Sequence, residues 1–456
     1  MKKNMKYAPF LLAALLLTAC GDASSACEAS GSAREEECSA EPAYASGADE
    51  AAKADDAAES PDALGLEAEP AADFTFDAVA EDAAKADAAL APEEPLPPDT
   101  DGIVPDSQIE PVEDPPADDG AQPFVLTAGE WNDNENWGFF ANLVHNGMIS
   151  FPSYGLDPVS RVAVTVTNGG VPAANQTVKL KGKNVLWTAK TDRNGNAYLF
   201  YDTEYAGREL TIETADAEPV QFTAPKNEAG QGGMQVPVLE FTIEAGAEAK
   251  KYADTEVCFI LDTTGSMSDE ITYLQKDFSA IAGEVAADGV TFSVNFYKDK
   301  GDSYVTRCNP FTDDVRMIQQ SLNQEYADGG GDTPEAVAEI LEEVLVNGDW
   351  HADTNKIAFL IFDAPPHSTP QAYETIQNAV RAAAEKGIHV VPVVASNAER
   401  ETELFGRALA IMTNGNYVFL TDDSGVGDSH LEPIIGPYDV ELLHDIIVRN
   451  IRRIAE

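Results

Sequence analysis

The sequence predicts a multidomain protein in which a doubly wound α/β domain follows an all-β sandwich and a disordered acidic tether. Three observations support this order. Fully apolar runs alternate with helical periodicity through residues 251–456, short strand-like runs at hairpin spacing fill residues 121–247, and residues 20–120 are rich in Asp, Glu, Ala and Pro. Residues 1–19 have the composition of a signal peptide. The chain of 456 residues therefore divides into four segments.

The first 20 residues, MKKNMKYAPFLLAALLLTAC, follow the plan of a secretory signal, with three lysines, an apolar stretch and small residues before Cys20. The apolar stretch is too short to span a bilayer. The final LTAC resembles a bacterial lipobox, which implies that Cys20 becomes the acylated, palmitate-bearing first residue of the mature protein. The alternative is an ordinary signal peptide with an incidental cysteine. Gly21 after the cysteine, in place of Asp, favours the outer membrane over retention at the inner one.

The acidic tether is predicted from its charge. Between Gly21 and Gly120 the chain carries 29 acidic and 3 basic residues, or −26 of the formal −50. Such a segment cannot bury enough apolar surface to offset the entropy of ordering it, so we expect a disordered, solvated spacer with a reach of roughly 50 to 60 Å. A tail that binds a basic partner is the alternative. The negative balance argues against nucleic acid as a partner, because phosphates would be repelled.

The five cysteines fit an exported chain. Cys27 and Cys38 lie in the tether, where an oxidising compartment could close a disulfide loop of about ten residues. Cys258 and Cys308 lie within or at the end of apolar strands, where buried or half-buried thiols are expected. The sequence contains no CxxC motif and no Cys/His spacing that predicts a zinc site.

The sandwich is predicted from period-two alternation. The stretch RVAVTVTNGG places Val162, Val164 and Val166 on one face and ends in a turn signal at Asn168-Gly169. Further strand-like runs follow at hairpin spacing: TVKLKG, VLWTAKT, AYLFYD, ELTIET, PVQFTA and PVLEFTI. Short strands without a long helical period predict an antiparallel sandwich. The segment TDRNGNAYLFY resembles the bacterial Ig-like and carboxypeptidase-regulatory-like sandwiches, although the sequence has no Ig-type cysteine pair.

Residues 251–456, here called the head, alternate between strand and helix patterns. Strands are expected at 257–261, 291–297, 304–308, 356–362, 388–394 and 417–420, and helices at about 267–287, 313–326, 334–346, 371–386, 398–412 and 439–454. Fully apolar strands such as IAFLIF suit a sheet that helices cover on both faces.

Oxygen-bearing side chains follow the strands of the head. Asp262 comes after the apolar run EVCFIL and Asp363 after IAFLIF, so the two carboxylates share one edge of the sheet if these strands are neighbours. Thr264 and Ser266 follow the first acid, and Thr333 follows a glycine run that permits a close turn. Five oxygen donors select a hard divalent cation, Mg²⁺ first and then Mn²⁺ or Ca²⁺.

Each of these features also has a local explanation. Ser266 followed by Asp269 matches a capping box, and Thr333 before Pro334 matches a helix N-cap with proline at the first helical position. Asp363 could end a strand at an ordinary turn. Four further polar residues on nearby loops are expected to be solvated: Asp299, Asp302, Asp332 and His367.

Taken together, the motifs resemble a von Willebrand factor type A domain with a metal-ion-dependent adhesion site. The family's DxSxS motif corresponds to Asp262–Ser266, with Thr264 in place of the usual serine, and its later threonine and aspartate correspond to Thr333 and Asp363. The resemblance implies a Rossmann-like fold in which Ser266, Thr264 and Thr333 bind the metal and Asp262 and Asp363 hold coordinated waters. It also implies a non-catalytic role in which a Glu or Asp of a protein partner completes the metal's coordination.

The resulting hypothesis is a lipid-anchored cell-envelope protein that binds a protein or another anionic ligand through a metal. Two alternatives stay open. The stretch LDTTGS also resembles haloacid-dehalogenase-type phosphohydrolases, although Thr264 stands where their second acid would be. The other is a structural envelope scaffold with a vestigial metal site. A Ser/His/Asp hydrolase is disfavoured, because the sequence has no GxSxG motif.

Overall fold

The computed structural model describes residues 125–226, 229–230, 233–246, 249–286, 289–331, 333–425 and 429–455. The predicted signal peptide, the acylated Cys20, the acidic tether and the Cys27–Cys38 pair lie outside these residues. Within the part of the chain that the structure describes, no helix has the length and the apolar composition needed to cross a membrane.

The head is built on an eight-stranded sheet in the order β14-β13-β12-β15-β16-β17-β1-β18. The five strands from β13 to β17 run parallel to their neighbours, whereas β14 and β1 pair antiparallel. This mixed α/β sheet confirms the predicted fold class of the head. In sheet order the strands are Thr306–Arg307, Val290–Tyr297, Thr255–Asp262, Asn355–Phe362, Ile388–Val394, Tyr417–Thr421, Thr127–Trp131 and Glu441–Leu442.

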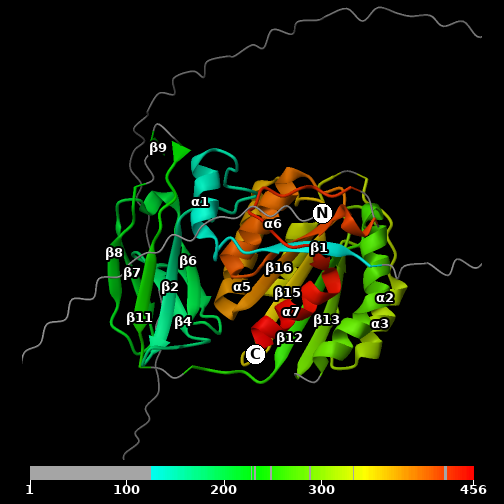
Figure 1. The fold of residues 1–456 in the computed structure, drawn as a ribbon, viewed down its shortest axis with the longest axis horizontal. Coiled ribbons are helices and arrows are strands. Elements are labelled where there is room, and N and C mark those ends of the chain that lie inside the picture. The colour runs from blue at the N-terminus through cyan, green and yellow to red at the C-terminus, as the bar shows by residue number, and fades with distance from the viewer. Residues whose placement is uncertain are drawn as a thin grey trace, which may run out of the picture. The chain divides into compact units, whose positions relative to one another are not determined.

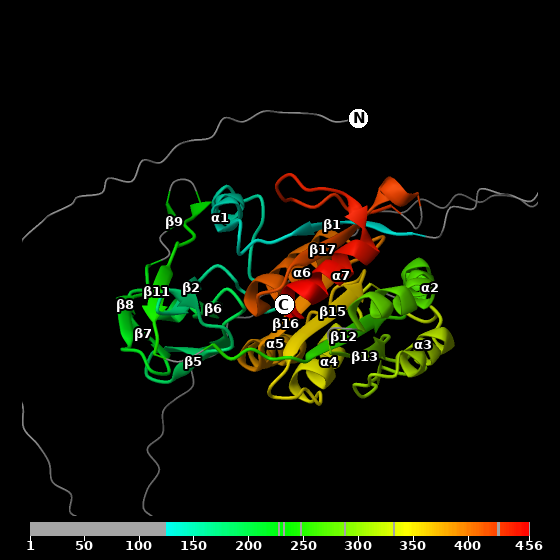
Figure 2. The ribbon, with the colours of Figure 1, turned by 60° about the horizontal axis from the view of Figure 1, so that its bottom comes forward.

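Helices cover both faces of this sheet, as Figures 1 and 2 show. In β12, Val257, Phe259 and Leu261 join one core with α2, α3 and α7, while Cys258 and Ile260 join the other core with α4, α5 and α6. The strand is apolar throughout because both of its faces are covered. The helices are α2 (Ser268–Val285), α3 (Val315–Gln324), α4 (Val337–Leu341, continuing as a π-helical turn Glu342–Val346), α5 (Pro370–Lys386), α6 (Arg400–Thr413) and α7 (Leu443–Ala455).

The strand β1 corrects the predicted domain boundary. It lies in the segment 121–247 that the sequence assigned to the sandwich, yet Thr127 pairs with Thr421 of β17 and with Leu442 of β18. Figure 1 shows β1 in cyan against the orange and red C-terminal elements. Because the partner of a five-residue strand is set by tertiary packing rather than by local pattern, the sequence could not assign it.

Two four-stranded sheets form the sandwich. The buried side chains of Val162, Val164 and Val166 confirm the predicted alternation. The pair β11–β2 runs parallel, so the prediction of a purely antiparallel sandwich is wrong at that pair. One sheet contains β2 (Arg161–Asn168), β3 (Val171–Pro172), β6 (Asn196–Phe200) and β11 (Glu240–Glu244), and the other contains β4 (Thr177–Lys181), β5 (Val185–Lys190), β7 (Glu209–Thr214) and β8 (Val220–Thr223). The remaining elements are α1 (Trp137–His145), the strands β9 (Ala229–Gly230) and β10 (Gly233–Met234), and 3-10 turns at Thr203–Tyr205, Gly265–Met267 and Asp422–Ser424.

The sandwich and the head share one hydrophobic core. The cluster that contains Val162 and Leu180 of the sandwich also contains Ile376 of α5 and Phe405 of α6. A polar contact adds to this core, because Arg407 of α6 donates to both carboxylate oxygens of Asp133, at 2.8 Å each. A fragment that starts at residue 251 would therefore lack β1 and expose part of this core.

Candidate metal-binding site

The two predicted acidic ligands lie side by side at the edge of the sheet. Asp262 ends β12, and Asp363 follows the end of β15. These two strands are parallel neighbours in register, with Leu261 opposite Ile361. Both carboxylates therefore stand at the carboxyl end of the sheet, where ligands bind in open α/β folds.

Each of these carboxylates keeps one buried oxygen that accepts no hydrogen bond from a described residue. Asp262 is fully buried, and its Oδ1 accepts hydrogen bonds from the backbone N and the Oγ1 of Thr264, at 2.9 and 2.7 Å. In the part of the chain that the structure describes, Asp262 Oδ2 and Asp363 Oδ1 have no hydrogen-bond partner. Burying such an oxygen without a partner costs free energy, so the site favours a ligand that satisfies both atoms.

Electrostatics favour a cation at the same place. Burial and the negative charge of Asp363 raise the pKa of Asp262. Burial and the charge of Glu270 raise the pKa of Asp363, while Ser266 acts in the opposite direction. A nearby positive charge would reverse these shifts, because it favours the ionised form of each carboxyl group.

Helix capping does not account for the predicted hydroxyl ligands. Helix α2 begins at Ser268 with Met267 at its N-cap, and α4 begins at Val337 with Ala336 at its N-cap; neither N-cap side chain caps its helix. The capping box at Ser266 and the helix start at Thr333 are thus wrong as local explanations. Both hydroxyl-bearing residues are exposed, so they remain accessible to a ligand.

A glycine loop packs directly over the first motif. Gly330 has a φ of +68°, and a Cβ there would lie 3.2 Å from Glu335 Oε1 and 3.3 Å from Thr264 Cβ. Gly265 donates to the carbonyl of Gly329 at 3.3 Å. The left-handed backbone and the close approach both require glycine at position 330.

Two side chains from the β13–β14 loop hold the glycine loop in place. Asp302 Oδ2 accepts from the backbone N of Gly330 at 2.8 Å and from that of Asp299 at 3.1 Å. Lys298 is almost fully buried and donates to the carbonyl oxygens of Thr263 and Asp328 and to the Asp328 carboxylate. The rim of the site is therefore fixed by contacts that do not involve the predicted ligands.

Glu335 is a site residue that the sequence analysis missed. It is buried, its Oε2 has no partner among the described residues, and its pKa is raised to about 9 by burial and by the charges of Asp262 and Asp299. The expectation that Asp299 is solvated is wrong, because Asp299 is buried with Oδ1 at 2.6 Å from Nε2 of His367. Asp332 lies outside the described residues.

The donor set fits a hard cation. Among the described residues, no three His, Cys, Asp or Glu side chains are grouped so as to hold a metal ion by themselves. The predicted set differs from such a cluster, because it combines two carboxylates with the hydroxyls of Thr264, Ser266 and Thr333. Mixed neutral and anionic oxygens are ligands that Mg²⁺ and Ca²⁺ accept. The unpartnered oxygens of the two aspartates are the structural feature that a cation would satisfy.

A row of polar residues near the site resembles a hydrolase triad. Ser396 Oγ lies 3.3 Å from His430 Nε2, and His430 Nδ1 lies 2.8 Å from Asp422 Oδ1. The serine hydroxyl donates instead to Glu270 Oε1 at 2.6 Å, and Ser396 is buried while Asp422 is exposed. In a hydrolase the base must accept the serine proton and the serine must reach the substrate, so this geometry supports a structural role.

Comparison with known proteins gives a family match within the head. Residues 256–427 match the von Willebrand factor A domain family. A protein of Acanthamoeba polyphaga mimivirus described as an ariadne-like RING finger protein is 24% identical over 212 residues, which cover 42% of this chain and 20% of that protein. The crystal structure of the conserved hypothetical protein BatB from Bacteroides thetaiotaomicron matches with a TM-score of 0.30 and 18% identity, covering 38% of this chain and 91% of that one.

The chain thus contains a von Willebrand factor A domain and spans one fifth of the length of the curated relative. Domains of this family indicate a protein-interaction or adhesion-type function and are generally non-catalytic.

Proposed function

We propose that this chain is a non-catalytic binding protein of the cell envelope whose head holds a protein or another anionic ligand through a divalent cation. The observation that supports the proposal most is the pair of buried oxygens, Asp262 Oδ2 and Asp363 Oδ1, that lie at neighbouring strand ends without a described partner. Mg²⁺ is the first candidate, followed by Mn²⁺ and Ca²⁺, because every proposed ligand is an oxygen.

The proposed ligands of the cation would have different roles. Thr264, Ser266 and Thr333 would offer neutral hydroxyl oxygens, and Asp262 and Asp363 would hold charge or bound water beneath them. When bound, the cation supplies a positive centre that attracts one more anionic oxygen, which a Glu or Asp of a protein partner can provide.

The contacts around the glycine loop prepare this surface for binding. Lys298 and Asp302 fix the loop against the first motif through bonds to the backbone at Asp328 and Gly330. A rim that is already ordered loses less conformational entropy when a partner binds. The head is therefore suited to recognition without a large rearrangement.

The first test replaces Asp262 with asparagine in the full chain. Without metal, the variant should unfold at the same or a higher denaturant concentration than the parent, because it removes a buried charge beside Asp363. With Mg²⁺ or Mn²⁺ at about 100 times the parent's Kd, the parent should gain about 2.7 kcal/mol and the variant should gain almost nothing. Calorimetric metal titration and denaturant unfolding give the two measurements.

Two further variants sharpen the metal test. Thr333→Ala removes an exposed hydroxyl that caps no helix, so the fold should survive while metal affinity falls by at least about tenfold, or roughly 1.4 kcal/mol. Asp254→Asn is the matched control, because it makes the same change of charge at an exposed residue. Asp254 precedes the first residue of β12, whereas Asp262 is the last residue of that strand. If Asp262→Asn and Thr333→Ala bind metal as the parent does, the assignment of the site is wrong.

The envelope location rests on the LTAC motif and has its own test. We propose that Cys20 carries the lipid anchor that holds the protein at a membrane, with the outer membrane favoured by Gly21. Cys20→Ser should move the mature protein from the membrane fraction to the soluble fraction on detergent partitioning. Unchanged partitioning of this variant would rule out lipidation as the anchor and leave the metal site unaffected.

A further inference from the structure

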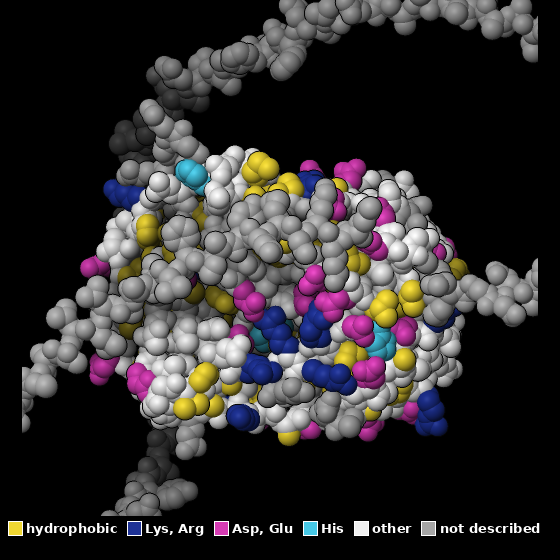
Figure 3. Space-filling model, in the orientation of Figure 1, with side chains coloured by type: hydrophobic (Ala, Val, Ile, Leu, Met, Phe, Trp, Pro, Cys, Tyr) yellow, Lys and Arg dark blue, Asp and Glu magenta, His cyan; other side chains and the backbone are white. Residues whose placement is uncertain are grey.

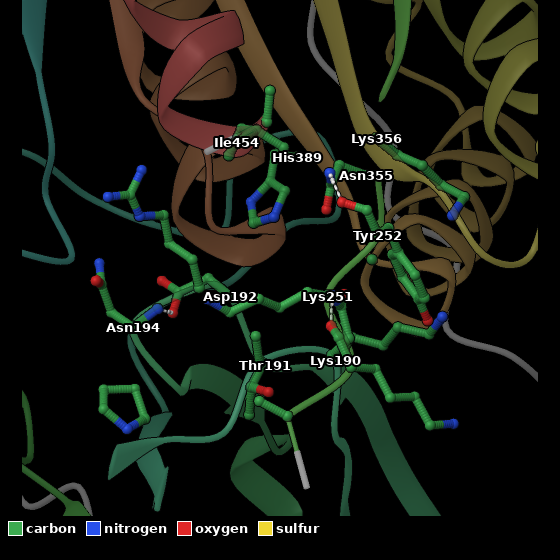
Figure 4. A pocket seen from close by; sticks show the side chains of 18 of the residues that line it. Lys190, Thr191, Asp192, Asn194, Lys251, Tyr252, Asn355, Lys356, His389 and Ile454 are labelled. Atoms are coloured by element: carbon green, nitrogen blue, oxygen red, sulfur yellow. Dashed lines mark hydrogen bonds between the residues drawn. The ribbon is translucent and has the colours of Figure 1, made fainter. Parts of the chain in front are cut away.

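A cavity of about 320 Å³ lies where the sandwich, the head and the segment between them meet, at the start of β15, whereas Asp363 follows the end of that strand. Figure 4 shows its lining side chains from close by, and Figure 3 shows Lys and Arg side chains gathered on this face of the molecule. The lining comes from residues 172, 174 and 175 at and after β3, residues 190–194 at and after the end of β5, residues 249–252 of the linking segment, the starts of β15 and β16, and residues 453–455 at the end of α7.

The charge of this cavity is opposite to that of the chain. The whole sequence carries 79 acidic and 29 basic residues, yet among the described residues that line the cavity Asp192 is the single acid. Its basic lining residues are Lys190, Arg193, Lys250, Lys251, Lys356 and Arg453. A local reversal of charge in a concave site concentrates anions there.

Most of these cations have no acidic partner in the part of the chain that the structure describes. Of the six, Arg453 pairs with Glu135 at 2.7 Å, and the other five form no ion pair with a described residue. The neighbouring arginines of α7 behave differently, since Arg449 pairs with Glu130 and Arg452 with Glu284. The cavity thus holds five basic side chains that no described acid pairs with directly.

Two of the lysines crowd around one aromatic ring. The Nζ atoms of Lys190 and Lys356 lie 5.8 and 5.9 Å from the ring centre of Tyr252, and Figure 4 shows Lys356 beside this tyrosine. Burial and the charge of Lys190 lower the pKa of Lys356 to about 8, although Glu256 and Asp353 act in the opposite direction. Lys356 is 2% exposed, so its charge is poorly solvated and a bound anion would stabilise it.

We propose that this cavity binds the phosphate groups of a small multiply charged ligand, at least a diphosphate in size. The volume is about ten times the ~30 Å³ that one water molecule occupies in the liquid, so a single oxyanion would leave most of it empty. Five basic side chains without a direct ion pair around one cavity favour several negative charges close together, which linked phosphates carry and a single carboxylate does not. Lysine ammonium groups and the guanidinium of Arg193 are both suited to phosphate oxygens.

The test measures binding of inorganic phosphate and pyrophosphate to the full chain by calorimetry, in excess EDTA so that the metal site is empty. We expect pyrophosphate to bind more tightly than phosphate. The double variant Lys190→Gln/Lys356→Gln should weaken pyrophosphate binding by at least about tenfold, the change that corresponds to loss of roughly 1.4 kcal/mol. Lys183→Gln, an exposed lysine of the β4–β5 turn outside the cavity, should bind pyrophosphate like the parent.

A second pair of variants guards against misfolding. Lys250 and Lys251 are exposed, so Lys250→Gln/Lys251→Gln should keep the far-UV circular dichroism spectrum of the parent and still bind pyrophosphate more weakly. If both double variants bind like the Lys183→Gln control, or if the parent binds none of the probes, the proposal is wrong.

A vesicle experiment distinguishes a free phosphate compound from a lipid headgroup. On a Cys20→Ser background, the chain is mixed with phosphatidylcholine vesicles that contain or lack phosphatidic acid. If the chain binds the vesicles that contain phosphatidic acid, and Lys250→Gln/Lys251→Gln abolishes this binding, the phosphate belongs to a lipid headgroup. Pyrophosphate binding without vesicle binding would assign it to a free compound. The vesicle experiment is also carried out in excess EDTA, so either outcome is independent of the proposed metal-dependent function.

Discussion

Replacing Asp133 with alanine should destabilise the protein by about 3 kcal/mol, because it breaks a buried ion pair between the segment after β1 and helix α6. Asp133 and Arg407 are both buried, and two parallel hydrogen bonds of 2.8 Å join them. Arg407 also donates to Glu403 Oε1 at 3.2 Å and to the carbonyl of Ile434 at 2.9 Å. The substitution therefore removes two of the four hydrogen bonds that this guanidinium donates.

The expected loss of unfolding free energy depends on the contacts that Arg407 keeps after the substitution. A hydrogen bond to a charged group contributes about 1.5 to 3 kcal/mol, and removing one partner of a buried pair typically costs about 3 to 5 kcal/mol. Because Glu403, which also pairs with Arg400, still accepts a hydrogen bond from Arg407 after the change, we expect a loss near the lower end of that range. This is a large fraction of the roughly 5 to 15 kcal/mol that stabilises a typical domain.

Urea unfolding followed by far-UV circular dichroism and by tryptophan fluorescence measures the loss. If the sandwich and the head unfold as one unit, both probes should report the same shifted transition. Glu218→Ala, at an exposed acidic residue of the sandwich, should leave the midpoint almost unchanged. In the double variant Asp133→Ala/Arg407→Met the loss should be smaller than the sum of the two single losses. A loss below about 1 kcal/mol for Asp133→Ala, or strict additivity in the double variant, would refute this reasoning.

Two other predictions concern the glycine loop and the C-terminal helix. Gly330→Ala should cost about 1 to 2 kcal/mol of unfolding free energy and weaken metal binding, because its φ is +68° and the new Cβ would lie 3.3 Å from Thr264 Cβ; an unchanged metal titration would contradict this. Burial lowers the pKa of His444, but hydrogen bonds to Glu284 and Asp277 outweigh it, so the folded-state pKa lies above 6.5. The parent's stability advantage over His444→Gln should therefore be full below about pH 6.5 and shrink as the pH rises through the folded-state pKa; an advantage that grows with pH would contradict it.

The sequence by itself determined the parts of the structure that local pattern encodes. The apolar run from Val257 to Leu261 predicted a strand buried on both faces, and β12 occupies it. Strict alternation at Val162, Val164 and Val166 predicted an inward-facing strand of the sandwich. Both patterns can be recognised because successive side chains of a strand point to opposite faces of the sheet. A strand buried on one face therefore alternates between apolar and polar residues, and a strand buried on both faces is apolar throughout. The same logic placed Asp262 and Asp363 at the ends of two apolar strands, whereas the structure showed that these two strands are neighbours.

Tertiary structure alone decided which distant segments meet. It paired β1 with β17 across 294 residues, from Thr127 to Thr421, and it buried Glu335 near the acids of the proposed metal site. It also brought Lys190, Lys251 and Lys356 to one cavity from three separate segments. The local sequence around a short strand or a single charged residue does not indicate which distant segment it will contact. Its place is set by the packing free energy of the whole fold, which local periodicity does not encode.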